Sequence, residues 1–264
     1  MFNGKRVIGV CLTKLHWSGC SEYLDSLNRY AGKNDCKLIV FNSFVDFYRN
    51  DDSDQGAHSV YDVINFDLVD ALIISNNSFN NKQVVRGLID AAHAHGRPVL
   101  VLEGDYEECY NIRSSYDDAY TSLMTHVIRE HHARDTYYMA GRREGDPASQ
   151  RRIQCYRRAV ESCGLPFEES RVGYGEFWSD PAKKIVQQMV ESGNKLPDAI
   201  FCANDYMAIA VCDKLREYGL KVPEDVIVTG FDGTDAARYA VPQISTCAED
   251  QDQLARLSIE TIFA

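Results

Sequence analysis

Polar side chains stand directly after predicted strands in this sequence, and they are the residues whose types and positions could do chemistry. The apolar run Ala199–Ala203 has the length and composition of a buried strand, and Asn204 and Asp205 follow it at once. A second apolar run, Val226–Phe231, ends on Asp232. Small ligands bind in parallel α/β sheets beyond the carboxyl ends of the strands, so we expect a ligand at this edge. We expect Asp205 instead to cap the helix that follows it.

The first part of the chain supplies a second set of candidates at strand ends. A site for a polar small molecule needs planar amide or carboxylate groups to fix hydroxyls, and aromatic faces to cover apolar ring surfaces. The side chains that could do this are Thr13, His16, Trp17, Ser75, Asn76, Asn77 and Glu103. A plainer interpretation stays open for each, because such residues also cover a domain surface or stand in the turn before a helix.

The sequence carries no catalytic signature. It has no GxxxxGK[ST] phosphate loop, no GxSxG elbow, no HExxH and no GxGxxG opening a helix after a strand. The nine cysteines are scattered through apolar segments without a CxxC pair, so we expect reduced thiols and neither a metal nor a cofactor. His126, His131 and His132 fall on one predicted helix, and we interpret them as solvated surface. We therefore expect a protein that is not an enzyme.

The bulk composition is that of a soluble globular protein. The chain has 264 residues, 45% of them hydrophobic, and a formal net charge of −11. Binding to nucleic acid needs clustered basic side chains, so nucleic acid is excluded as the partner of this chain. Its N-terminal apolar run is too short for a signal peptide, and no run reaches the length of a transmembrane helix. We expect a cytoplasmic protein without a membrane partner.

The order of strands and helices predicts the fold class. Short apolar strands alternate with amphipathic helices in two sets, which is typical of α/β proteins with doubly wound parallel sheets. We expect two such lobes, formed by residues 1–109 plus 249–264 and by residues 110–248, with the ligand between them. The predicted strands are 6–12, 36–42, 71–75, 98–102, 135–141, 171–174, 199–203 and 226–231.

Residues 199–233 also carry a family resemblance. They read AIFCANDYMAIAVCDKLREYGLKVPEDVIVTGFDG, and the run from NDxxA through the VPED turn to GFD resembles the effector-binding region of the lactose-repressor (LacI/GalR) family. The resemblance implies a fold like that of type I periplasmic binding proteins. It also implies that a ligand touching both lobes binds the closed form more tightly than the open form and so shifts the population toward the closed form.

The resemblance extends to single positions. Arg152 lies in a segment similar to the family's R-x-x-G-[FY] helix, in which the arginine faces the effector, although Cys155 replaces the usual glycine here. Trp178 matches a position where the family often has an aromatic residue on the ligand. Asn204 and Asp232 match strand-end ligand positions. Glu249 lies at the second crossing between the lobes. For each residue, packing, capping or a surface ion pair remains the plainer alternative.

The function implied by the resemblance is the sensing of a small effector, a sugar or sugar-like metabolite, by a homodimer. The segments 110–120 and 137–169 look more like input domains of GGDEF diguanylate cyclases than like ordinary repressors, so we favour that output. The alternatives are the effector-binding core of a transcriptional regulator, a solute-binding protein for transport, and an enzyme that uses the cleft. The chain ends within a predicted helix and has no helix-turn-helix, from which we expect a piece of a longer protein.

Overall fold

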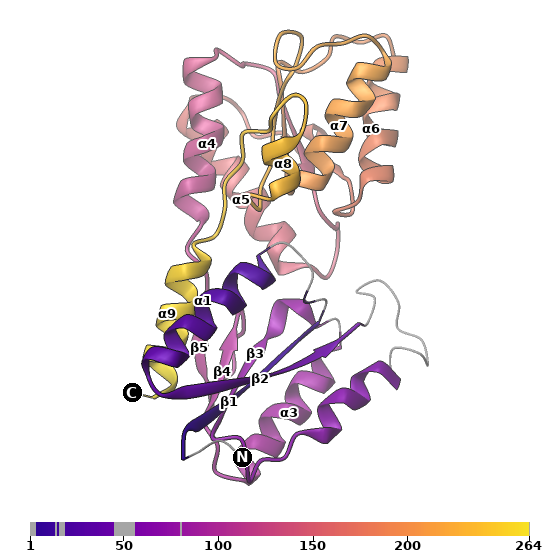
Figure 1. Ribbon diagram of the computed structural model, residues 1–264. Helices are drawn as coiled ribbons and strands as arrows, with labels where there is room; N and C mark the ends of the chain where they lie inside the picture. The colour runs from indigo at the N-terminus through magenta and orange to yellow at the C-terminus, as the bar shows by residue number, and fades with distance from the viewer. Residues whose placement is uncertain (1–3, 14, 16–18, 45–55, 80, 264) are drawn as a thin grey trace. The chain divides into compact units, whose positions relative to one another are not determined.

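The chain folds into two α/β units. The computed structural model describes residues 4–13, 15, 19–44, 56–79 and 81–263 (Figure 1). Contacts between residues divide the chain into unit 1, which is Met1–Ser114 with Asp250–Ala264, and unit 2, which is Ser115–Glu249. Each unit is built on one parallel sheet. The predicted fold class is confirmed.

The sheet of unit 1 has five parallel strands in the order β2-β1-β3-β4-β5. Parallel pairing places the carboxyl ends of all its strands at one edge, which is where the predicted polar residues come together. The strands are β1 (Arg6–Thr13), β2 (Cys36–Ser43), β3 (Ala71–Ser75), β4 (Val99–Leu102) and β5 (Tyr110–Ile112). The sequence analysis missed β5, which is only three residues long and partly exposed.

Helices cover both faces of this sheet, and the alternation of side chains along β1 explains why. Ile8, Val10 and Leu12 point to the face covered by α1 and α9, whereas Val7 and Cys11 belong to the core on the other face. Figure 1 shows α1 and α9 side by side on their face. The helical elements are α1 (Cys20–Lys33), η1 (Ser59–Val63), η2 (Asn76–Ser78), α3 (Lys82–Ala94) and α9 (Gln251–Ile262), of which η1 and η2 are 3-10 helices.

Unit 2 repeats this architecture with a sheet of four parallel strands in the order β7-β6-β8-β9. Its strands are β6 (Thr136–Ala140), β7 (Val172–Tyr174), β8 (Ala199–Cys202) and β9 (Ile227–Thr229). Its helices are α4 (Asp117–Glu130), α5 (Pro147–Ser162), the 3-10 helix η3 (Glu169–Arg171), α6 (Ser179–Glu191), α7 (Asp205–Glu217) and the short α8 (Asp235–Tyr239).

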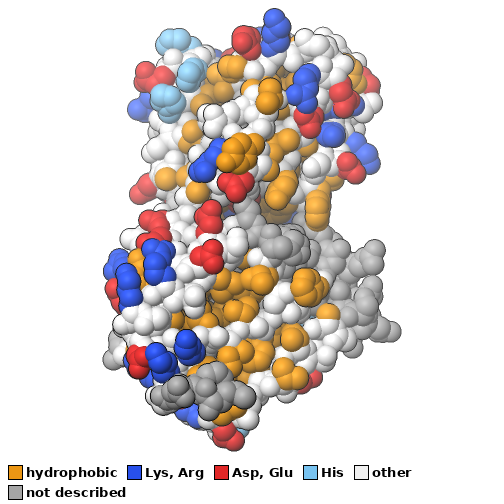
Figure 2. All heavy atoms as spheres, in the orientation of Figure 1, with side chains coloured by type: hydrophobic (Ala, Val, Ile, Leu, Met, Phe, Trp, Pro, Cys, Tyr) orange, Lys and Arg blue, Asp and Glu red, His pale blue; other side chains and the backbone are white. Residues whose placement is uncertain are grey.

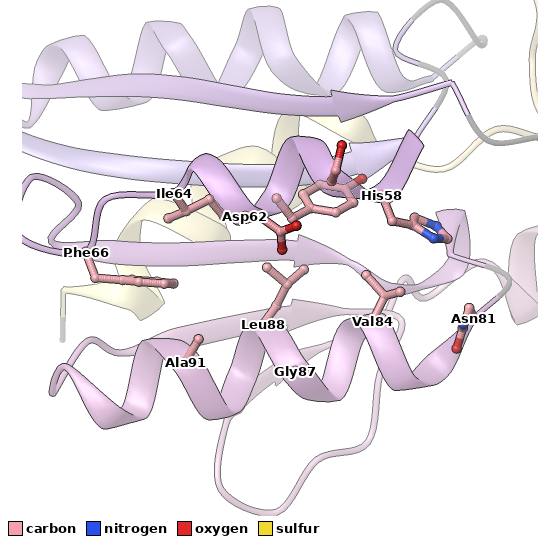
Figure 3. Close-up of a pocket in the computed structure, with 11 residues that line it drawn as sticks. His58, Asp62, Ile64, Phe66, Asn81, Val84, Gly87, Leu88 and Ala91 are labelled. Carbon is pink, nitrogen blue, oxygen red and sulfur yellow. The ribbon is translucent and has the colours of Figure 1, made fainter. Parts of the chain in front are cut away.

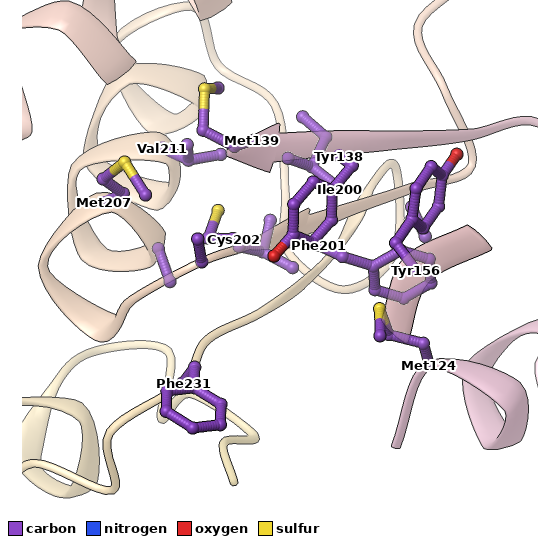
Figure 4. Close-up of a cluster of buried hydrophobic side chains, with 14 of the residues drawn as sticks. Met124, Tyr138, Met139, Tyr156, Ile200, Phe201, Cys202, Met207, Val211 and Phe231 are labelled. Carbon is purple, nitrogen blue, oxygen red and sulfur yellow. The ribbon is translucent and has the colours of Figure 1, made fainter. Parts of the chain in front are cut away.

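Large side chains fill the core of unit 2 (Figure 4). The rings of Tyr138 and Tyr156 stack with their centroids 5.0 Å apart, and Phe201 packs beside Tyr156. Burying each such ring contributes roughly 2 kcal/mol. The hydroxyl of Tyr120 donates to the carbonyl of Cys202 at the end of β8 (2.9 Å). The core therefore fixes the strand end that carries the functional side chains.

The nine cysteines are all free thiols, as predicted. Burial raises the pKa of the Cys202 thiol far above its usual range, so this cysteine acts as a small hydrophobic residue. Within the described residues, no helix is long and apolar enough to cross a bilayer.

Candidate functional site

Arg152 is the centre of the candidate site in unit 2. It projects from α5, is 11% exposed, and donates from Nη1 to the carbonyl of Ala203 (2.6 Å) just beyond β8. Its guanidinium lies over the ring of Phe231, with 4.0 Å to the centroid. Within the described residues the buried Nε atom has no hydrogen-bond partner. A buried donor without a partner costs about 1–3 kcal/mol, so this group is suited to a ligand acceptor.

Asp232 faces Arg152 from the loop after β9. Its Oδ1 lies 3.6 Å from Nη2 of Arg152, too far for a hydrogen bond but close enough for an ion pair. Burial raises the pKa of Asp232 to about 7; Arg152 opposes this rise, while Asp205 and Glu249 add to it. The backbone of Asp232 has a φ of +113°, in the region that favours glycine. Such strain is typical of functional positions.

The electrostatics of Arg152 follow from the same neighbours. Burial alone lowers the pKa of its guanidinium, but Asp232 and the surrounding tyrosines raise it more, so the net pKa is raised. Arg152 is therefore a permanent cation beside a carboxyl that titrates near neutrality. Cys155, which replaces the glycine usual in the family, lies within the unbroken helix α5, and its buried thiol accepts from Arg158 (3.4 Å).

Phe177 is a residue of this site that the sequence analysis missed. Its ring lies 5.7 Å from the Arg152 guanidinium and fills the space where a side chain on Gly141 would stand. Its φ of +62° turns the ring in this direction, and its carbonyl accepts from Nδ2 of Asn204 (3.1 Å). The neighbouring Trp178, which was predicted, is 45% exposed. Gly141 was the available signal, since a glycine at a strand end leaves room for a ring.

Asn204, and not Asp205, caps the helix α7. Asn204 is the N-cap of α7, where its Oδ1 accepts from the backbone N–H of Met207 (2.9 Å). Asp205 was predicted to be the cap, and this is wrong, because it is the first helical residue and its carboxylate turns to the loop after β9. The ligand contact predicted for the 7% exposed Asn204 stays a prediction.

In unit 1, polar side chains at the strand ends are bonded to neighbouring turns. Thr13 donates from Oγ1 to the carbonyl of Ser78 (2.6 Å), which joins the end of β1 to the turn after β3. Asn76 donates to the carbonyl of Glu103 (2.7 Å), and Oγ of Ser75 donates to Asn77 (3.0 Å).

These bonds bring the ends of β1, β3 and β4 together. The carboxylate of Glu103 accepts from the backbone N–H of Ser114, and the φ of Glu103 is +54°. Thr13 is buried, whereas Asn77 is exposed. His16 and Trp17 lie outside the described residues. Glu249, the last residue of unit 2, is half-buried and contributes to the raised pKa of Asp232.

The histidines at the end of α4 are surface residues, as predicted. His131 and His132 are exposed, and the rings of His126 and His131 lie 5.3 Å apart. Figure 2 shows histidine side chains gathered over this end of α4. In the part of the chain that the structure describes, no three His, Cys, Asp or Glu side chains are arranged to hold a metal ion.

Unit 1 also contains a groove between η1 and α3 (Figure 3). Its volume is about 520 Å³, and Ile64, Phe66, Val84 and Leu88 form apolar walls beside Asp62. The strand-end residues of unit 1 described above do not line it.

The arrangement in unit 2 has groups that could bind a small polar molecule. A fixed cation, a carboxyl and an aromatic ring converge at one strand edge, which suits recognition of hydroxyls or amides on an apolar ring.

Several known proteins are similar to this chain. The HTH-type transcriptional repressor PurR of Vibrio parahaemolyticus is 34% identical over 116 residues, which are 44% of this chain and 34% of that repressor. A PurR of Vibrio campbellii is 24% identical over 261 residues, covering 99% of this chain and 75% of that protein. A solved complex of the transcriptional regulator CelR with cellobiose matches 98% of this chain and 78% of its own, with a TM-score of 0.79 at 18% identity.

The fold is an α/β fold with parallel sheets in two lobes, like that of LacI-family proteins. Residues 124–264, just over half of the chain, match the family described as periplasmic binding protein-like domain, and the chain belongs to that family. The resemblance to LacI/GalR effector-binding domains is thereby confirmed. The alignment with the first relative spans about a third of that repressor's length.

Proposed function

We propose that the chain is the effector-binding core of a transcriptional regulator and that it binds a small polar molecule at the strand edge of unit 2. The observation that carries the proposal is the buried Arg152, which has an Nε donor that no described residue uses, an ion pair with Asp232 and a guanidinium 5.7 Å from the ring centroid of Phe177. In this proposal Arg152 and Asp232 grip polar groups of the ligand, and Phe177 covers its apolar face. Trp178, Asn204 and Glu249 are proposed as outer contacts.

The output that we propose differs from the one that the sequence favoured. The segments 110–120 and 137–169 suggested a GGDEF module, but the relatives found are HTH-type transcriptional repressors. These relatives support regulation of transcription, with the DNA contacts made outside this chain. They also favour a sensor over an enzyme or a transport protein.

We infer a sugar or sugar-like effector, and we propose Thr13, Asn76 and Glu103 as ligand-binding residues of unit 1. The complex of CelR with cellobiose supports the ligand class. Amides and carboxylates with an aromatic ring are the groups that recognise a polyol with apolar ring faces. His16, Trp17, Ser75 and Asn77 are the remaining proposed contacts of unit 1.

We also propose a homodimer. The lac repressor that shares this fold was solved as a dimer. In unit 2, Tyr239 and Val241 are 76% and 79% exposed, and large apolar side chains at such exposure are suited to an interface. Sedimentation of the wild type and of Val241→Asp tests this, since the wild type is expected as a dimer and the variant as a monomer.

A thermal-shift panel of sugars, nucleosides and amino acids tests the binding function. A ligand present at about a hundred times its Kd stabilises the native state by about 2.7 kcal/mol, which raises Tm by roughly 5–10 °C in a protein of this size. We expect a saturable shift with at least one sugar. We also expect the shift to be lost in Arg152→Met and kept in Arg157→Met, whose side chain pairs with Glu161 on the exposed part of the same helix. A sugar that shifts both variants equally contradicts the proposed site.

A further inference from the structure

Asp205 is a fully buried carboxylate that the proposed ligand contacts do not use. It stands at the first position of α7, where Asn204 already supplies the cap. One carboxylate oxygen accepts from the backbone N–H of Thr234 (2.7 Å), and the other accepts from the hydroxyl of Thr246 (2.6 Å). A buried carboxylate is stable only when such donors satisfy it, so both bonds matter.

These two bonds join three separate segments of unit 2. Thr234 closes the loop that carries Asp232, and Thr246 belongs to the segment 245–249 that ends the unit. The same two segments are bonded to each other, because the N–H of Asp232 donates to the carbonyl of Cys247 (2.8 Å) and the N–H of Gly233 donates to Oγ1 of Thr246 (3.2 Å). Asp205 is therefore the common acceptor at the back of the Asp232 loop.

The local sequence leaves room for this carboxylate. A Cβ on Gly230 would stand 2.2 Å from Oδ1 and 3.1 Å from the Cα of Asp205, so only glycine fits at the start of the loop. The strained φ of +113° at Asp232 needs surroundings that determine it. The bonds of this loop to Asp205, Thr246 and Cys247 hold the backbone in that conformation.

We propose that Asp205 is a positioning residue, which holds the loop 230–234 so that the carboxyl of Asp232 faces Arg152 and ties that loop to the segment 245–249. The inference rests on the proposed function, since it assigns to Asp205 the support of the proposed ligand group. A ligand that contacts Asp232 then also affects the last residues of unit 2, because Thr246 is bonded both to Asp205 and to the loop that carries Asp232. Asp205 itself does not touch the ligand.

The chain offers a matched control at the opposite end of β8. Asp198 precedes this strand, and its Oδ2 accepts from the backbone N–H groups of Arg134 and Asp135 (both 2.9 Å). It is thus a second aspartate that links backbone segments of the same sheet, at the amino end instead of the carboxyl end. Asp198→Asn disturbs a comparable set of bonds without touching the Asp232 loop.

Nuclear magnetic resonance of the 264-residue chain tests the inference without any ligand. In Asp205→Asn an amide N–H replaces one acceptor oxygen, so one of the two donors loses its partner. We expect hydrogen exchange at the amides of Asp232 and Thr234 to rise at least about tenfold over the wild type, the effect of losing a buried hydrogen bond to a charged group. We also expect the Nε–H resonance of Arg152 to move.

The further variants separate positioning from general destabilisation. Thr246→Val should also raise hydrogen exchange at the amides of Asp232 and Thr234, but by less than Asp205→Asn does. Thr246→Ser, which keeps the hydroxyl, should exchange at the same rate as the wild type. Asp198→Asn should leave the Asp232 and Thr234 amides and the Arg152 resonance unchanged. Equal changes in Asp205→Asn and Asp198→Asn, or an unmoved Arg152 resonance in Asp205→Asn, overturn the inference. Neither result bears on whether unit 2 binds a sugar, which the thermal panel decides.

Discussion

The raised pKa of Asp232 makes the stability of the protein depend on pH in a direction that can be calculated. Burial raises the pKa of this carboxyl to about 7, well above the roughly 3.9 of an aspartate in an unfolded chain. Between these two values the folded state keeps a proton that the unfolded state has released. The contribution of Asp232 to stability is therefore fully present below the unfolded pKa and is lost as pH rises through about 7.

The size of the effect follows from the width of this window. From pH 5.5 to the folded pKa is about 1.5 pH units, or roughly 2 kcal/mol at 1.36 kcal/mol per unit. The side chain is 33% exposed, so solvent screening reduces this to about 1 kcal/mol. Asp232→Asn, which has the shape of the protonated carboxyl, removes the titration. We expect the stability of this variant relative to wild type to rise by about 1 kcal/mol between pH 5.5 and 8.5.

Urea unfolding of the wild type and of Asp232→Asn across this pH range measures the difference between their free energies of unfolding. The contributions of the other titrating groups are common to both proteins and cancel in this difference. Asp198→Asn is the control, because the pKa of Asp198 is lowered whereas that of Asp232 is raised. Burial tends to raise the pKa of Asp198, but hydrogen bonds from the N–H of Asp135, from Lys195 and from the N–H of Arg134 lower it more, so the net pKa is lowered. Its contribution is constant above the unfolded pKa and is lost only in more acidic solution. A pH profile of Asp232→Asn parallel to that of wild type refutes the reasoning.

Three further predictions concern the core and the site of unit 2. Gly230→Ala should lower the free energy of unfolding by about 1–3 kcal/mol in a urea titration, because the new Cβ would stand 2.2 Å from Oδ1 of Asp205. An unchanged free energy of unfolding would show that the loop can shift to accept the methyl group. Tyr120→Phe should cost about 1 kcal/mol by the same assay, because it removes the bond to the carbonyl of Cys202, and an unchanged midpoint would contradict that bond. Phe177→Ala should weaken binding of a panel sugar about tenfold and also lower Tm, because the ring packs on the core of unit 2. Equal affinity would remove the ring from the proposed site.

Much of the fold could be predicted, because its signals are local. Runs of Val, Ile and Leu in the pattern of buried parallel strands identify β1, β3 and β8 to within a residue or two of the observed bounds. The helices between them follow from their apolar faces. β5 carries no such signal, because its three residues pair with β4 through their backbone while their side chains are partly exposed.

The site could be predicted only in part, because its geometry depends on contacts distant in sequence. Asp232 was identified from its place at a strand end and from the family resemblance, and Arg152 from the resemblance alone; the structure brings the two together. Phe177 enters through a backbone conformation that its own sequence does not predict. The role of Asp205 depends on Thr246, 41 positions away, so a local interpretation could see only a helix cap. Gly141 and Gly230 mark where these side chains need space.

The affinity of a panel sugar for four versions of the chain tests the central claim most directly. Titration calorimetry with the sugar that gives the largest thermal shift should show saturable binding to the wild type and to Arg157→Met with the same Kd. Loss of a charged hydrogen-bond partner costs about 1.5–3 kcal/mol, so Arg152→Met should bind at least about tenfold more weakly. Asp232→Asn should weaken binding in the same direction. Equal affinity in all four proteins, or no binding to the wild type by any sugar, would contradict the claim that this strand edge is an effector site.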